Sequence, residues 1–356
     1  MIDGAGPWGT GPYQLVEGVS APAKRSGRVI LEANANYWDK SRSPRVKRIV
    51  FDNTLSLKDA LELVKSGEGR VDVITDLSPV ETLRVAQSAS ATVVKSRGSL
   101  QTVFGQFNML KTGSPWRDVR LRQALNYAIN RSDMIEYGAR GNGVVIPALI
   151  PARGFGHDPQ LAPYPFDPGK AKDLLRQAGH PDGLAVSLIA SEEMEAQATV
   201  ISKMLEQIGL KVELRILDPV TYNKKTLLSG LDQPAEKQTW DIALTAYLDP
   251  LNFPAYLLYQ GYALDGPNDW VVEQPALRQL YEQVLGTVDR DKQRVIYQQM
   301  ERHTRDQAYF LFLYNPVQLY AVNKDVQFVP YVSNLNFLES SVTDRHWSVR
   351  KGAVKK

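Results

Sequence analysis

Closely spaced carboxylates are the residues of this chain best suited to acid–base chemistry. Glu192, Glu193 and Glu195 lie almost side by side in the sequence. If the fold brought two of them together, one could act as general acid and the other as general base in a hydrolase. The same residues are also typical of the first turn of a helix, where the helix dipole favours negative charge. We expect the helix role and keep a hydrolase that uses Asp or Glu carboxylates as an alternative function.

Histidines, cysteines and glycines predict neither a metal site nor a cofactor. The chain has no cysteine, and no two of its histidines stand four residues apart as in a helical zinc motif. Gly9-Thr10-Gly11 lacks the Lys-Ser/Thr pair that a phosphate-binding loop requires. We therefore expect turn glycines at a strand entrance there. The histidines are His157, His180, His303 and His346.

The composition is that of an ordinary globular protein of about two domains. The 356 residues are 43% hydrophobic and 23% charged, with a net charge of +3 and no basic stripe, which argues against a nucleic-acid partner. No apolar run approaches the roughly 20 residues of a membrane span, so we expect no membrane insertion. The N-terminal MIDGAGPWGTGPY lacks the basic and apolar regions of a signal peptide.

Helix and strand patterns alternate along the chain and predict an α/β fold. Strands are expected at 28–33, 46–51 and 71–74, and a helix opened by a Ser56–Asp59 capping box and ended by Gly67 precedes the third. Farther on, Asp167 and Pro168 open a second helix. The remaining expected elements are strands at 184–190 and 210–216 around a helix at 193–208, typical of a parallel crossover, then a strand at 240–247, two helices and a long apolar strand at 309–320.

The segment 115–131, PWRDVRLRQALNYAINR, predicts a capped amphipathic helix. Asp118 can cap its N-terminus. Four apolar residues follow at i, i+3, i+4 and i+7 spacing and should face the core. Three arginines fall on or near the other side, where we expect them to be solvated. The apolar residues are Leu121, Ala124, Leu125 and Ala128, and the arginines are Arg120, Arg122 and Arg131.

The same segment resembles "PF.D.RVR.AL..AIDR", a signature of the solute-binding proteins that serve ABC importers of oligopeptides, dipeptides and nickel. Other segments resemble motifs of that family in the same order: GTGPY at 9–13, YW at 37–38, SGE at 66–68 and DPGKAKDLL at 167–175. The chain is therefore identified as similar to the family 5 extracellular solute-binding proteins. Because GTGPY lies well inside the family's chains, the N-terminal third, which includes a small extra domain, is expected to be missing here.

The resemblance implies a two-lobed, periplasmic-binding-protein-like (type II) α/β fold. Residues 1–105 and 315–356 would form a partial lobe one, and residues 106–314 would form lobe two. The chain would then cross between the lobes twice, near 104–108 and 312–315, and these crossings would be the hinge.

The resemblance also implies ligand-binding residues, half of them in the segment 240–253, WDIALTAYLDPLNF. The candidates there are Tyr247, which stands where relatives carry a Trp, Thr245 on the same strand, and Asp249 of the DP pair. The loop after Tyr247 is shorter than in peptide-binding relatives and leaves no clear counterpart of the aspartate that binds a peptide's α-ammonium. Core packing of Tyr247 and a structural role of Asp249 remain alternatives. Further candidates are Asn108, Tyr222 and Tyr314.

The function that the resemblance implies is that of the substrate-binding component of an ABC importer. It would bind a small solute, a peptide or peptide-like molecule, in a cleft between the lobes and deliver it to the membrane permease, without catalysis or a cofactor. We expect a monomer in the periplasm or outside the cell, membrane-associated through the transporter. The alternatives are the hydrolase above and a truncated remnant that binds nothing.

Overall fold

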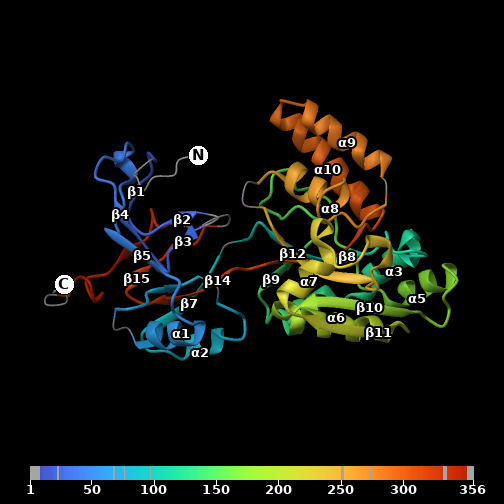
Figure 1. The fold of residues 1–356 in the computed structure, drawn as a ribbon, viewed down its shortest axis with the longest axis horizontal. Coiled ribbons are helices and arrows are strands. Elements are labelled where there is room, and N and C mark those ends of the chain that lie inside the picture. Colours follow the sequence, from blue (N-terminus) through green and yellow to red (C-terminus); the bar gives the residue numbers. More distant parts are fainter. Residues whose placement is uncertain are drawn as a thin grey trace. The chain divides into compact units, whose positions relative to one another are not determined.

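The chain forms two compact units (Figure 1). The structure is a computed structural model and describes residues 9–21, 24–66, 69–75, 77–96, 98–249, 252–272, 274–331 and 335–350. Unit 1 holds residues 1–97 and 318–356, and unit 2 holds residues 98–317. The predicted helix end at Gly67 and the proline of the DP pair, Pro250, lie outside the described residues.

The units divide at 97/98 and 317/318, whereas the resemblance placed the division at 105/106 and 314/315. The expected hinge positions fall in or next to β8 (Gln101–Phe107) and β13 (Phe310–Pro316), which pair with each other in the sheet of unit 2. On its other side β8 pairs along its whole length with β12 (Ile242–Leu248). Continuous strand pairing therefore holds both segments inside unit 2, and the assignment of the units to lobes remains a prediction.

A six-stranded mixed sheet of order β11-β10-β12-β8-β13-β9 is the centre of unit 2. β10 (Ala185–Ser191) runs parallel to β11 (Lys211–Leu217) and to β12, which confirms the predicted parallel pairing. β8 is antiparallel to β12 and β13, and β13 is antiparallel to β9 (Gly143–Val145). The architecture is mixed α/β, as predicted.

Helices cover both faces of this sheet. α6 (Glu195–Gln207) buries Ile201 in the core cluster that contains Leu188 of β10. α7 (Pro219–Thr226) sets Tyr222 against the cluster that contains the next strand residue, Ile189. Because successive strand residues point to opposite faces, α6 and α7 lie on opposite faces. The other helical segments are η2 (Pro115–Arg117), α3 (Val119–Ala128), α4 (Arg131–Asp133), η3 (Met134–Gly138), α5 (Pro168–Gln177), η4 (Glu192–Met194), η5 (Leu228–Gly230), η6 (Ala235–Lys237), η7 (Ala255–Gln260), α8 (Gly261–Ala263), α9 (Pro275–Gly286) and α10 (Arg290–Asp306).

The predicted helix starts are confirmed by the side chains that cap them. Asp118 accepts a hydrogen bond from the backbone N of Arg120 at 2.8 Å, and Asp167 caps α5 in the same way. Ser56 accepts from the backbone N of Asp59 at 3.1 Å, next to α1 (Leu57–Ser66). All four apolar residues predicted to face the core from α3 are buried. Caps depend on neighbours a few residues away, so the sequence alone can predict them.

Two of the three arginines expected to be solvated are buried, and the expectation was wrong for them. Arg122 and Arg131 are each 4% exposed, while Arg120 is exposed. Arg122 Nη2 donates to the carbonyl of Gln307 at 2.7 Å, and Arg131 Nε donates to the carbonyl of Phe312 at 2.7 Å. These long side chains reach main-chain carbonyls just before and within β13, a contact that helical spacing does not reveal.

Asn126 completes this contact between α3 and β13. Its Nδ2 donates to the carbonyl of Phe310 at 2.9 Å, and its Oδ1 accepts from Phe312 N at 3.1 Å and from Arg131 Nη2 at 3.0 Å. Among the described strands, β9 pairs only with residues 314–316 of β13. Side chains of α3 and α4 therefore supply hydrogen bonds that a further strand would otherwise make along this edge.

The long apolar strand predicted at 309–320 is two strands in different sheets. β13 ends at Pro316, and β14 (Leu319–Asn323) lies in unit 1 between β6 (Val73–Ile74) and β7 (Ala91–Lys95). Proline has no N–H for a strand ladder, so Pro316 is a natural end for β13.

Unit 1 contains two three-stranded sheets, β1-β4-β5 and β6-β14-β7. In α1, Leu61 and Val64 are buried, whereas Leu57 at the start of the helix is 44% exposed. The other elements are β1 (Tyr13–Glu17), β2 (Ser20–Ala21), β3 (Lys24–Arg25), β4 (Arg28–Ala33), η1 (Lys40–Arg42), β5 (Arg48–Asp52), α2 (Thr82–Ala86), β15 (Val326–Gln327) and β16 (Ser341–Val342).

Limited proteolysis should leave a core derived from unit 2. The largest hydrophobic cluster lies entirely within this unit, whereas the sheets of unit 1 are smaller. Fewer buried contacts mean easier local opening, which proteases require. We expect a resistant fragment spanning much of residues 110–310, identified by mass spectrometry. Preferential survival of residues 1–100 would contradict this expectation.

Candidate functional site

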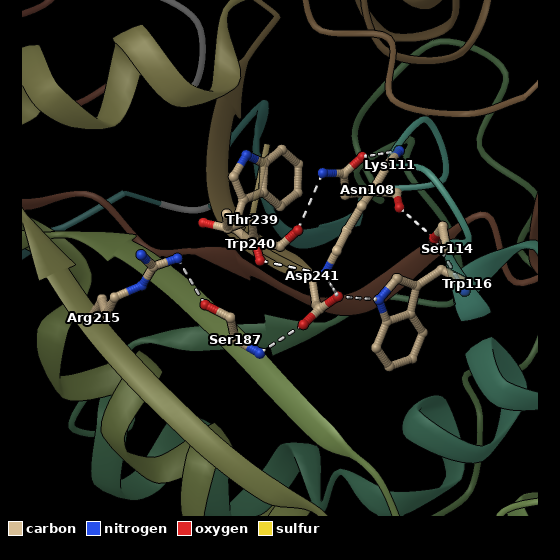
Figure 2. Close-up of polar contacts among 9 residues, drawn as sticks. All are labelled: Asn108, Lys111, Ser114, Trp116, Ser187, Arg215, Thr239, Trp240 and Asp241. Atoms are coloured by element: carbon tan, nitrogen blue, oxygen red, sulfur yellow. Dashed lines mark hydrogen bonds and ion pairs between the residues drawn. The ribbon is translucent and has the colours of Figure 1, made fainter. Parts of the chain in front are cut away.

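Asp241, directly before β12, is the centre of a buried polar cluster (Figure 2). Its Oδ1 accepts hydrogen bonds from Lys111 Nζ at 2.9 Å and Trp116 Nε1 at 3.2 Å. Its Oδ2 accepts from Ser187 N at 2.9 Å, and the residue is 7% exposed. The carboxylate thereby joins β10 and the segment 111–116 to the start of β12. Its role is to hold this strand in place.

Asn108, a predicted ligand-binding residue, belongs to the same cluster and is fully buried (Figure 2). Its backbone N donates to Asp241 O at 3.0 Å, and its Nδ2 donates to Trp240 O at 3.1 Å. Its Oδ1 accepts from Lys111 N at 3.0 Å. The amide nitrogen thus holds the chain just before β12, and the amide oxygen holds the backbone of Lys111. The ligand-binding role of Asn108 remains a prediction, and this packing leaves the side chain no surface for a solute.

Three side chains from different elements meet beside the C-terminal half of β12. The Tyr222 hydroxyl, from α7, donates to the carbonyl of Leu244 at 2.8 Å and lies 2.9 Å from Thr245 Oγ1. Thr245 Oγ1 in turn donates to Gln106 Oε1 of β8 at 2.9 Å. Tyr222 and Thr245 are partly exposed, whereas Gln106 is buried. Two of the predicted site residues therefore lie within hydrogen-bonding distance of each other.

Tyr247 lies two residues after Thr245 and so points to the same face of the sheet. Its ring meets that of Tyr262 in α8 edge-on, with the centroids 5.3 Å apart, and Tyr262 meets Phe104 of β8 at 5.2 Å. Tyr247 packs against the main core of unit 2 but is only partly buried. Tyr247 therefore packs against the core and also keeps part of its surface exposed. We call Gln106, Tyr222, Thr245, Tyr247 and Tyr262 the β12 cluster.

Burial raises the pKa of the tyrosine hydroxyls of the β12 cluster above its already high ordinary value. It raises the pKa of Tyr222 to about 12, although hydrogen bonds with two threonine side chains oppose the rise. Burial also raises the pKa of Tyr247, to which the Asp249 carboxylate adds, and the pKa of Tyr262, to which the neighbouring Tyr222 and Tyr247 add. At neutral pH these hydroxyls therefore offer hydrogen-bond donors and acceptors without charge.

Sequence reasoning missed Gln106 and Tyr262. A signal for Gln106 exists, because it interrupts the apolar run VFGQF in a strand. Tyr262 gives no comparable signal, since it reaches Tyr247 only after α8 folds back onto β12.

Asp249 and Tyr314, both predicted site residues, are each 2% exposed. Asp249 Oδ1 accepts from Phe253 N at 3.1 Å, and its carbonyl accepts from Asn252 N at 3.3 Å, which is the geometry of a structural turn. The Tyr314 hydroxyl accepts from Gln197 Nε2 of α6 at 3.1 Å. Their ligand-binding roles remain predictions, and both side chains are engaged within unit 2.

The three carboxylates suggested for acid–base chemistry stand where a helix begins. Glu192 and Glu193 are in η4, and Glu195 is the first residue of α6. Within the part of the chain that the structure describes, no group of three His, Cys, Asp or Glu residues could hold a metal ion. None of the described helices is long and apolar enough to cross a membrane.

Another carboxylate, Glu301 of α10, is completely buried. Its Oε1 and Oε2 accept from the backbone N of Leu149 at 3.3 Å and of Ile150 at 3.0 Å, and Oε1 also accepts from the Tyr259 hydroxyl. Burial raises the pKa of Glu301 to about 7, and these hydrogen bonds oppose the rise. A raised pKa is typical of a general acid, but this group has no exposed surface and holds a backbone loop.

Residues 3–269 match the family described as "Bacterial extracellular solute-binding proteins, family 5 Middle". The chain belongs to this family. The dipeptide-binding protein of Escherichia coli (strain K12) is 27% identical over 331 residues, which cover 90% of this chain and 58% of that protein. The glutathione-binding protein GsiB of Salmonella choleraesuis (strain SC-B67) is 28% identical over 220 residues, which cover 60% of this chain and 40% of that protein. The chain thus spans 58% or less of these two family members.

A solved family 5 structure extends the likeness to the fold. The periplasmic binding protein DppA from Helicobacter pylori, in complex with the peptide STSA, superposes with a TM-score of 0.71 at 20% identity. The superposition covers 94% of this chain and 63% of that one. The predicted periplasmic-binding-protein-like fold is confirmed.

Replacing Asp241 by Asn should destabilise this family 5 chain by about 1–3 kcal/mol, because an amide nitrogen would face a buried N–H and Lys111 would lose its counter-charge. Urea unfolding followed by circular dichroism would measure the loss. Asp173→Asn is the control: it removes an exposed charge pair with Arg176 and should change stability by less than about 0.5 kcal/mol. Equal stability of the two variants would contradict the role given to Asp241.

Proposed function

We propose that this chain is the solute-binding component of an ABC importer, which binds a small solute, a peptide or peptide-like molecule, and delivers it to a membrane permease. The observation that carries the proposal is the family match over residues 3–269. Two relatives are named for a dipeptide and for glutathione, and a third was solved with a peptide. All three ligands are amide-containing molecules, which is why we favour a peptide-like solute for this chain.

The β12 cluster is the proposed contact surface for that solute. It combines aromatic area, from Tyr247, with neutral polar groups, from Tyr222 and Thr245, as small-molecule sites commonly do. It also stands on a central strand that Asp241 fixes at its start, so the groups are held in place before a solute arrives. Such preorganisation lowers the entropy cost of binding.

The proposal includes the setting in which the protein works. Unit 1 would correspond to lobe one and unit 2 to lobe two, in a monomer that acts in the periplasm or outside the cell and meets the membrane through its transporter. Family membership and the family's description as extracellular support this setting. The protein would bind its solute without converting it. Two observations argue against the hydrolase. Glu301 is buried, and Glu192, Glu193 and Glu195 lie where a helix begins.

A panel of solutes tests the proposal. Dipeptides, tripeptides, glutathione, heme and nickel complexes would be added to the purified chain, and its melting temperature followed by scanning fluorimetry. A true ligand at about 100 times its Kd should raise the melting temperature on the order of 2–5 °C, because it binds only the folded state. Mass spectrometry of the mixture should find the solute unchanged.

Two results would contradict the proposal. If no solute of the panel changes the melting temperature and no small molecule co-purifies with the chain, the chain is the non-binding remnant. If a peptide is cleaved at a rate that rises with the concentration of the protein, the chain is a hydrolase instead.

A further inference from the structure

The Tyr222 and Thr245 hydroxyls have two protons between them but take part in three close polar contacts. The Tyr222 proton is directed to the carbonyl of Leu244, and the Thr245 proton to Gln106 Oε1. Gln106 cannot donate to Thr245 instead, because its Nε2 already donates to the carbonyl of Asn268 at 2.6 Å. The contact between the Tyr222 and Thr245 oxygens, at 2.9 Å, is left without a proton of its own. The two oxygens therefore have lone pairs to offer and can accept from an external donor.

The surroundings of this acceptor pair carry little charge. Thr245 Oγ1 contacts Gln106 and Tyr222, and the Tyr262 ring contacts Tyr247 and Phe104; all of these side chains are uncharged at neutral pH. Asp249 raises the pKa of Tyr247, but the residue is 2% exposed and its carboxylate accepts from Phe253 N. An ammonium brought to this place would lose its water without gaining an accessible anion, and such a loss is unfavourable.

We propose that the β12 cluster receives an uncharged hydrogen-bond donor of the solute, the N–H of an acylated amine, rather than a free α-ammonium. An amide N–H would supply the missing proton to the Tyr222–Thr245 pair, and the acyl group would lie against the partly exposed ring of Tyr247. The inference rests on the proposed function and narrows its substrate class to N-acylated, peptide-like solutes.

Isothermal titration calorimetry with matched peptides tests the inference on the full chain at pH 7.5. The probes are trialanine and Ala-Phe-Ala, each as the free peptide and as its N-acetyl derivative. We expect the N-acetyl form to bind at least about tenfold more tightly than its free form in at least one pair, because only the free form must desolvate an unpaired ammonium. If the free form binds as tightly or more tightly in both pairs, the inference is wrong. If no probe binds, the inference is also wrong. The proposed function is tested separately, by the solute panel.

Variants locate the effect in the β12 cluster. Thr245→Val keeps the shape of the side chain but removes the acceptor, and should weaken binding of the N-acetyl probe by about tenfold. Thr245→Ser restores the hydroxyl and should restore binding, which separates loss of the acceptor from loss of the fold. Tyr137→Phe removes the hydroxyl of a tyrosine that is 70% exposed and outside the cluster, and should change nothing. An unchanged affinity in a folded Thr245→Val variant would contradict the inference.

The Asp249→Asn variant tests whether Asp249 binds a free α-ammonium of the solute. Asparagine can still accept from Phe253 N through its Oδ1, so the turn should persist. We expect the ratio of affinities for the free and N-acetyl probes to stay within about threefold of the original, since the carboxylate is not used for recognition. A selective loss of free-peptide binding would identify Asp249 as the ammonium partner and overturn the inference.

Discussion

The contact between α3 and the edge of β13 is the constraint on which unit 2 depends. The guanidinium groups of Arg122 in α3 and Arg131 in α4 and the amide of Asn126 in α3 are almost free of solvent, and they bond main-chain groups of residues 307–312 directly. Burial lowers the pKa of Arg122 and Arg131 to about 10, so both remain charged at neutral pH. Carbonyl dipoles offset the cost of burying these charges. Arginine suits this place better than lysine, because its planar group offers five donors in fixed directions.

A second polar contact, made by Asp241, fixes the strand that bears the candidate site. Asp241 ties the start of β12 to β10 and to the segment that precedes α3, while β8 pairs with β12 along its length. Thr245 and Tyr247 then project from a strand that is held at its start and along one edge. The contacts of Asp241 with Trp116 and Ser187 are thus structural, and they position the strand that carries Thr245 and Tyr247.

Local features of the fold could be predicted from the sequence, and long-range ones could not. Asp118 caps α3 because the contact spans two residues, and the apolar spacing reports its buried face. The burial of Arg122 depends on a carbonyl 185 positions away, which no local pattern reports. In the site, Thr245 and Tyr247 could be selected from one strand. Gln106 stands out in the sequence only as a polar residue in an apolar run, and Tyr262 gives no comparable signal. Their contacts with β12 could not be predicted, because β8 and α8 meet β12 only in the folded chain.

Hydroxyl-radical footprinting of the tyrosines would test the central claim, that the accessible face of β12 binds the solute. The chain would be oxidised with and without the solute that raises its melting temperature most, and modification of each tyrosine would be measured by mass spectrometry. Oxidation of the partly exposed Tyr247 should fall several-fold on binding, while the 70% exposed Tyr137 should react equally in both samples. Unchanged oxidation of Tyr247 by a solute that stabilises the protein would contradict the account and place the binding surface elsewhere.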